Sequence, residues 1–146
     1  MLRFGYFNLI LLFSIQLSFG GEGKLIKLPD FKKDSNFSIE KAIYQRRSTR
    51  SFSSKSLRLS DISALLWAGQ GITSRDRLRT APSAGALYPI ELYLVAFNVE
   101  ALSPGIYKYL PFEHSLKLIK PQDIKNELCS AALGQECVKE ASAVIV

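Results

Sequence analysis

Apolar residues recur at helical spacing in two stretches of the first half of the chain. In the first stretch, Ile39, Ala42 and Ile43 fall on one face. Ser38 stands just before them, and serine is among the residues that cap helix N-termini well. This pattern predicts a short helix from Ser38 to about Arg47.

The second stretch predicts a longer helix. Ser60 is its expected N-cap, Asp61 places a negative charge in the first turn, and Gly71 is expected to end it. Trp67 lies off the centre of the apolar stripe, so we expect it to pack in the core or at an interface. The stripe itself consists of Ile62, Leu65, Leu66 and Gly69.

Strand patterns dominate the second half of the chain. Residues 90–99 are apolar and aromatic, which is typical of a buried strand. Residues 111–114 separate two further strand patterns and predict a hairpin turn. A helix is expected to break at Gly134, before a shorter helix that carries Cys137. The other expected elements are strands at 105–109, 115–119 and 143–146, and a helix at 122–133.

The N-terminus has the layout of a secretory signal. Arg3 gives a positive start, an apolar run follows, and Ser18 and Gly20 are small residues at the two positions that a signal peptidase reads. We expect residues 1–20 to be removed by cleavage after Gly20, and the protein to be exported, either periplasmic or secreted. An uncleaved membrane anchor is the alternative. Residues 21–37 are polar and Lys-rich without a clear period, which predicts a surface lead-in.

Charge is unevenly distributed along the chain, whose net charge is +6. Residues 41–80 hold nine Lys or Arg against two acids, a balance of +7. Residues 81–146 hold five against seven, a balance of −2. A basic half facing an acidic half favours a local anionic ligand. Nucleic acid is the rival explanation, and the expected export argues against it.

The sequence favours neither a metal site nor serine–histidine catalysis. His114 is the only histidine, and there is no Cys-x-x-Cys pair. Because His114 falls in the expected hairpin turn, we interpret it as a surface turn residue. Cys129 and Cys137 could pair in an oxidising compartment, or stay free as small hydrophobes in helical surroundings.

Residues 46–52, with the sequence RRSTRSF, concentrate three guanidinium groups and three hydroxyls. Guanidinium forks match phosphate oxygens, and a hydrogen bond to a charged group contributes about 1.5–3 kcal/mol. Arg46 and Arg47 have a simpler explanation, because cations near a helix C-terminus complement the helix dipole. That explanation does not reach Arg50, so the stretch is a candidate anion site.

Four segments, in this order and spacing, resemble the FMN-dependent nitroreductase family. The resembling branch is that of the SagB-type dehydrogenases, which include oxidases of thiazoline and oxazoline rings in modified peptides. The segments are RRSTRSF at 46–52, LLWAGQG at 65–71, TAPSAGALYP at 80–89 and PGIYKY at 104–109. The resemblance runs from about residue 38 to residue 146, and it implies an α+β fold of the three-layer α/β/α type, the nitroreductase-like FMN-binding fold.

The resemblance also implies which residues bind FMN. The phosphate and ribityl chain would be held by Arg46, Arg47, Ser48 and Arg50. The flavin ring would lie against the turn formed by Pro82, Ser83, Ala84 and Gly85. Small residues there would let the backbone approach the ring, although an ordinary Pro/Gly loop is the alternative. The resemblance assigns no acid–base residue; Tyr88 is a candidate and is equally a core aromatic.

An enzyme of this kind would transfer hydride through FMN, reduced by NAD(P)H or directly by an azoline-type small molecule or modified peptide. The full-length form would be a homodimer. Two features depart from the family: the export signal, and a missing second half, which would leave residues 38–146 as an incomplete domain truncated at its C-terminus. The alternatives are a flavin-binding or degenerate relative without turnover, and an exported basic module that binds an anionic surface.

Overall fold

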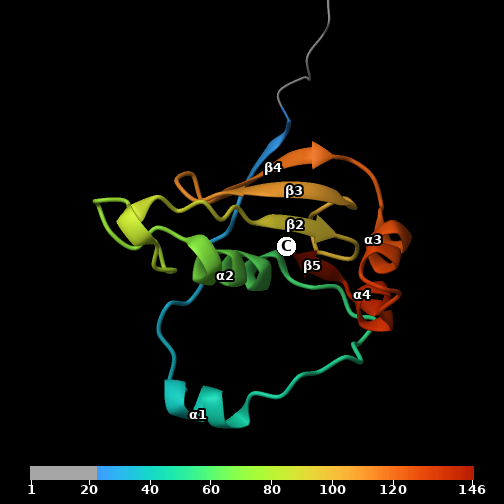
Figure 1. The fold of residues 1–146 in the computed structure, drawn as a ribbon, viewed down its shortest axis with the longest axis horizontal. Helices are drawn as coiled ribbons and strands as arrows, with labels where there is room; N and C mark the ends of the chain where they lie inside the picture. The colour runs from blue at the N-terminus through green and yellow to red at the C-terminus, as the bar shows by residue number, and fades with distance from the viewer. Residues whose placement is uncertain (1–22) are drawn as a thin grey trace, which may run out of the picture.

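A computed structural model describes residues 23–146 (Figure 1). The expected signal or anchor, residues 1–20, lies outside these described residues. The chain folds into an α+β unit on one five-stranded sheet of order β1-β4-β3-β2-β5, in which every neighbouring pair is antiparallel. The strands are β1 (Leu25–Lys27), β2 (Tyr93–Ala96), β3 (Gly105–Leu110), β4 (Ser115–Lys120) and β5 (Ala143–Ile145).

The β3–β4 hairpin confirms the strand predictions for this part of the chain. β3 alternates between buried and half-buried positions, and it turns Tyr107 and Tyr109 into the core. This period of two is what a strand with one covered face requires. β2 is shorter than the predicted strand 90–99, because only its four residues enter the ladder with β3.

Strand β1 corrects the prediction that residues 21–37 form only a surface lead-in. β1 pairs with β4 at the edge of the sheet and places Ile26 opposite Leu116. Leu28, just beyond it, is 2% exposed and belongs to the core. The polar composition of this segment therefore conceals a short edge strand with few inward apolar residues.

Helix α2 (Leu59–Gln70) lies against one face of the sheet (Figure 1). Its N-cap is Arg58 and not the expected Ser60, and no side chain caps the first turn. The carboxylate of Asp61 instead accepts from the guanidinium of Arg58, with 2.8 Å between Oδ1 and Nη2. A negative charge in this first turn is favourable, as predicted. Gly71 ends the helix, also as predicted.

The buried face of α2 is rotated relative to the predicted stripe. Leu66 is 0% exposed, but the neighbouring Leu65 is 57% exposed. The helix buries Ile62, Ser63, Leu66 and Gln70. The polar residues Ser63 and Gln70 are thus buried in place of Leu65 and Gly69, which the prediction had on the buried face. The resulting core comprises Leu28, Ile62, Leu66, Leu94, Ala96, Val99, Tyr107, Tyr109 and Leu116.

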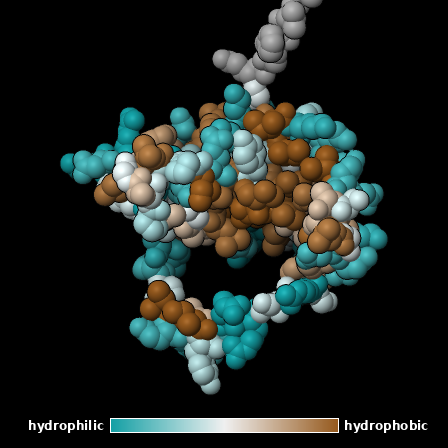
Figure 2. Space-filling view, viewed as in Figure 1, coloured by the Kyte–Doolittle hydropathy of each residue, from teal (hydrophilic) through white to brown (hydrophobic). Residues whose placement is uncertain are grey.

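Helix α1 (Ile39–Gln45) confirms the first predicted helix. The Ser38 hydroxyl accepts a hydrogen bond from the Lys41 N–H at 3.2 Å, which is the predicted N-cap. The helix buries none of its residues, and Figure 1 shows it standing apart from the sheet. Ile39 and Ile43 are exposed, and Figure 2 shows apolar side chains around α1 as well as over α2 and β5.

Helices α3 (Lys125–Ala131) and α4 (Glu136–Glu140) follow the hairpin, as predicted. Gly134 separates them with a left-handed φ of +72°, and its N–H donates to the Cys129 carbonyl at 2.8 Å. Cys129 is buried, Cys137 is half-buried, and both are free thiols. Within residues 23–146, no helix combines the length and the apolar character needed to cross a membrane.

Candidate functional site

Residues 39–53, which begin with α1, form an exposed arm, and the basic stretch 46–50 lies on it. Nη1 of Arg47 donates to the carbonyls of Tyr44 and Arg46, at 2.9 Å and 2.7 Å. This guanidinium therefore covers the C-terminal end of α1, as the simpler explanation expects. In the part of the chain that the structure describes, no hydrogen bond or ion pair occupies the side chains of Arg46, Ser48 and Arg50.

The small-residue turn 82–85 leads into the single 3-10 turn η1 (Ala84–Ala86). Gly85, Ala86 and Tyr88 have φ values of +62°, +52° and +46°. Left-handed backbone is uncommon outside glycine, so two non-glycine residues in this conformation within one short loop indicate strain held by the surroundings.

Tyr88 fastens this turn at both ends. Its backbone N–H donates to the Ser83 hydroxyl at 2.9 Å. Its own hydroxyl accepts from the Arg79 backbone N–H at 3.3 Å. The candidate acid–base residue therefore has a structural role that the sequence did not reveal: it fixes the conformation of the turn predicted to face a flavin.

The structure does not bring the two predicted halves of the flavin site together. Among residues 23–146, no hydrogen bond or ion pair joins the stretch 46–50 to the turn 82–85. The end of the arm instead lines a surface cavity in which Phe52 and Ser53 face Ala141 and Ser142. Pro82 and Ser83 line a different cavity, so within the described residues neither hydrogen bonds nor either of these two cavities connects the phosphate and ring halves of the prediction.

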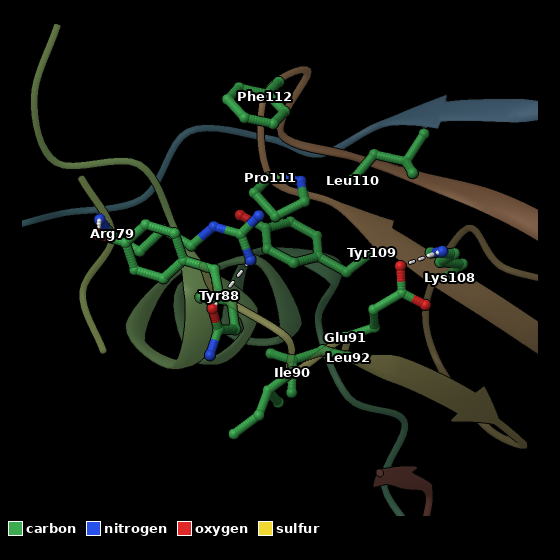
Figure 3. Close-up of a pocket in the computed structure, with 11 residues that line it drawn as sticks. Arg79, Tyr88, Ile90, Glu91, Leu92, Lys108, Tyr109, Leu110, Pro111 and Phe112 are labelled. Atoms are coloured by element: carbon green, nitrogen blue, oxygen red, sulfur yellow. Dashed lines mark hydrogen bonds and ion pairs between the residues drawn. The ribbon is translucent and has the colours of Figure 1, made fainter. Parts of the chain in front are cut away.

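Two neighbouring cavities, each of about 210 Å³, lie beside the turn. One is lined by Pro82 and Ser83, and both share Gln70, Tyr88 and Ile90. The second extends to β3 and the hairpin turn, as Figure 3 shows. No group of three or more potential metal ligands occurs in the described part of the chain.

Gln70 and Arg79 are site residues that sequence reasoning missed. Nη1 of Arg79 donates to Oε1 of Gln70 at 3.0 Å, and the guanidinium carbon lies 4.8 Å from the centroid of the Tyr88 ring. Gln70 is 5% exposed. Its spacing from Leu66 would have been the available signal, because it places a polar side chain on the buried face of a helix.

His114 is not the surface turn residue that we predicted. Its imidazole is half-buried, with Nε2 2.8 Å from the Ser63 hydroxyl and Nδ1 2.9 Å from the Tyr109 hydroxyl. Burial, reinforced by the charge of Lys27, lowers the pKa of His114. Burial also raises the pKa of Tyr109 to about 12, so its phenol stays protonated at neutral pH.

The antiparallel sheet, covered on one face by α2, is an α+β domain. The profile of the nitroreductase family matches residues 43–146, and the chain belongs to this family. The predicted α+β, nitroreductase-like fold is therefore confirmed.

Two relatives illustrate the sequence similarity. A protein of Methanocaldococcus jannaschii, described as a candidate nitroreductase, is 36% identical over 86% of this chain and 62% of its own length. The trifolitoxin operon protein TfxC of Rhizobium leguminosarum bv. trifolii is 25% identical over 64% of this chain and 30% of its own length. The chain thus spans less than two thirds of either relative.

Solved structures of candidate nitroreductases also resemble this chain. A candidate nitroreductase from Anabaena variabilis superposes with a TM-score of 0.68 and 27% identity, over 84% of this chain and 26% of its own. A candidate nitroreductase from Ralstonia eutropha superposes with a TM-score of 0.61 and 31% identity, over 73% of this chain and 49% of its own. A chain of the Escherichia coli microcin synthetase complex McbBCD, with truncated pro-MccB17 bound, superposes with a TM-score of 0.53 and 25% identity. The superposition covers 81% of this chain and 48% of that one.

Proposed function

We propose that this chain is the flavin-binding part of an FMN-dependent oxidoreductase. The observation that carries the proposal is the family match over residues 43–146, which includes both the basic stretch and the small-residue turn. FMN is the cofactor that nitroreductases generally use, and the match spans both segments to which the family resemblance assigned FMN binding.

The chemistry of the two segments fits such a group. Within residues 23–146, the guanidinium groups of Arg46, Arg47 and Arg50 have no carboxylate partner, so they can receive a phosphate. The Ser83 hydroxyl accepts from Tyr88 and keeps its own proton for donation. At Gly85, the absence of a side chain and the left-handed φ leave the backbone accessible.

A bound flavin would supply hydride transfer between a donor and an acceptor. The residues of this chain would bind and orient it. The arginines of the arm would hold its phosphate by charge-assisted hydrogen bonds, and Tyr88 would keep the turn in one conformation so that the backbone presents fixed donors.

We further propose the SagB-type branch, with a modified peptide or a small molecule as substrate and NAD(P)H as a candidate reductant. The similarity to the McbBCD synthetase with its bound precursor peptide supports this branch, and so does the similarity to a trifolitoxin operon protein. We propose a homodimer as the full-length form. Supporting it, Ile39, Ile43 and Tyr44 expose apolar area on α1, which a second copy would cover.

The test is to purify the full chain and record its visible absorbance before and after incubation with FMN. A flavin spectrum that remains after gel filtration, and that NAD(P)H or an azoline substrate bleaches, is the expected result. A bound flavin that no donor reduces would indicate a binding protein without turnover. A protein that stays colourless after reconstitution would contradict both readings and favour a basic anion-binding module.

Export is a separate proposal, which rests on residues 1–20 alone. N-terminal sequencing of secreted or periplasmic material should begin at Gly21, because Ser18 and Gly20 are the small residues in the positions read by a signal peptidase. A protein that retains Met1 and sediments with membranes would favour the anchor instead.

A further inference from the structure

The cavity in Figure 3 lies between the C-terminal end of α2, the loop before β2, and the hairpin turn after β3. Its volume of about 210 Å³ is about seven times the share of one water molecule in the liquid, about 30 Å³. Three aromatic side chains line it, contributed by separate parts of the chain: Tyr88, Tyr109 and Phe112. It is therefore a small site with aromatic walls.

Arg79 brings one positive charge into this cavity, and no carboxylate of the described residues is hydrogen-bonded to it. Its Nη1 donates to Gln70, while its Nε is buried without any hydrogen-bond partner in residues 23–146. Glu91 also lines the cavity and attracts Arg79 electrostatically, but its carboxylate accepts its hydrogen bonds from Lys108 and Tyr93. Within residues 23–146, the guanidinium thus has one hydrogen-bond acceptor, Gln70, and one stacked ring, Tyr88, so a carboxylate could accept from its remaining donors.

We propose that this cavity binds a small aromatic carboxylate. The carboxylate would lie on the guanidinium of Arg79, and the aromatic ring would lie among Tyr88, Tyr109 and Phe112. A planar carboxylate matches the guanidinium fork, and ring–ring contacts add favourable energy beyond area burial. A tetrahedral anion such as phosphate is a poorer match, because the walls offer it apolar and aromatic surface where it needs hydrogen-bond donors.

Tyr88 lines this cavity and also the neighbouring one formed by Pro82 and Ser83. A bound aromatic acid would lie beside the turn proposed to face the flavin. The inference goes beyond the proposed function, because it concerns binding by the flavin-free chain.

The first experiment titrates benzoate into the flavin-free full chain and follows binding by calorimetry or protein NMR. Benzamide keeps the ring without the charge, acetate keeps the charge without the ring, and inorganic phosphate is the tetrahedral anion. We expect saturable binding of benzoate, with each of the other three probes at least about tenfold weaker. Benzamide binding as tightly as benzoate would overturn the proposal.

Matched variants assign the site. Arg79→Met should weaken benzoate about 10- to 100-fold and leave benzamide within about twofold, because only the charged contact is lost. Arg75→Met is the control, since Arg75 is exposed and lies outside the cavity, and it should change neither probe. Each variant is first compared with the parent by circular dichroism.

Phe112→Ala provides a second variant in case Arg79→Met disturbs the loop. Phe112 is 55% exposed in the hairpin turn, so its removal spares the core. We expect benzoate to bind several-fold more weakly to Phe112→Ala, and acetate to bind unchanged. Benzoate binding that neither variant alters would overturn the proposal, and so would phosphate binding that is tighter than benzoate binding and depends on Arg79.

Discussion

The imidazole of His114 donates a hydrogen bond to the hydroxyl of Ser63, across 2.8 Å between Nε2 and Oγ. The direction follows from the third partner: Ser63 has one proton and donates it to the Pro29 carbonyl at 2.6 Å, so its oxygen can only accept from the ring. Nδ1 of His114 is then an acceptor, and the Tyr109 hydroxyl donates to it at 2.9 Å. The neutral imidazole thus satisfies every member of this network.

This geometry also excludes Ser63 as a nucleophile. A histidine within hydrogen-bond reach of a serine is the arrangement that activates a hydroxyl for attack. Ser63, however, is 0% exposed, and its proton goes to a backbone carbonyl and not to the imidazole. The Ser63–His114 pair therefore holds the segment after β1, helix α2 and the hairpin together, and it is not a hydrolytic centre.

The first prediction concerns the stability that this network supplies. Ser63→Ala should lower the free energy of unfolding by about 1–3 kcal/mol, because the Pro29 carbonyl and the His114 N–H lose their partner inside the protein. Urea unfolding of the full chain measures the change. Ser56→Ala is the matched control at an exposed serine, with an expected change within about 0.5 kcal/mol. Equal midpoints for the two variants would contradict the role of the network.

The second prediction is a loss of stability in mild acid. Burial lowers the pKa of His114 in the folded protein from its ordinary value of 6.5. The unfolded chain therefore binds a proton at a higher pH than the folded chain does. The contribution of this group is fully present above about pH 6.5, and it decreases as the pH falls from there toward the lowered pKa.

The charges around the His114 imidazole also lower its pKa on balance. Lys27 and Lys33 disfavour its protonation, and Asp30 opposes them with a smaller effect than that of Lys27. Urea midpoints measured between about pH 8 and about pH 5 test the slope. His114→Asn removes the imidazole and keeps a residue type that tolerates the left-handed φ of +43°, so its profile should be flatter. Parallel profiles for parent and variant would refute the assignment.

The third prediction tests the orientation of α2 with two adjacent leucines. Leu66 belongs to the core and Leu65 faces solvent. Leu66→Ala should lower the free energy of unfolding by about 2–5 kcal/mol, through lost burial and the cavity left behind. Leu65→Ala should change it by about 0.5 kcal/mol at most. If Leu65→Ala were as destabilising as Leu66→Ala, the sequence stripe and not the structure would describe the helix.

The orientation of α2 also shows what the sequence could and could not predict. Local patterns gave the caps at Ser38 and Gly71, the hairpin and the order of the later elements, because each depends on a few neighbouring residues. They could not predict that Ser63 and Gln70 would be buried. That outcome depends on the Pro29 carbonyl and on Arg79, which reach the helix from elsewhere in the chain.

Local patterns were also insufficient for β1 and for the candidate flavin site, because both depend on residues far apart in the sequence. A three-residue edge strand is specified by its partner β4, whose residues lie about ninety positions later. The basic stretch and the small-residue turn were recognisable as motifs. Their mutual placement is not a property of either motif, and no hydrogen bond or ion pair joins them in the described residues.

The last prediction separates the phosphate half of the proposed flavin site from the ring half. Arg50→Glu should weaken FMN binding at least about tenfold, because it replaces a charge-assisted contact with a repulsive charge. Riboflavin has the same ring and lacks the phosphate, so its affinity should stay within about twofold of the parent value. Flavin fluorescence quenching on the full chain measures both. Arg75→Glu, an exposed change of the same charge in the loop before the turn, is the control and should leave both flavins unaffected. Equal weakening of FMN and riboflavin by Arg50→Glu would mean that Arg50 supports the fold or the ring and does not bind the phosphate.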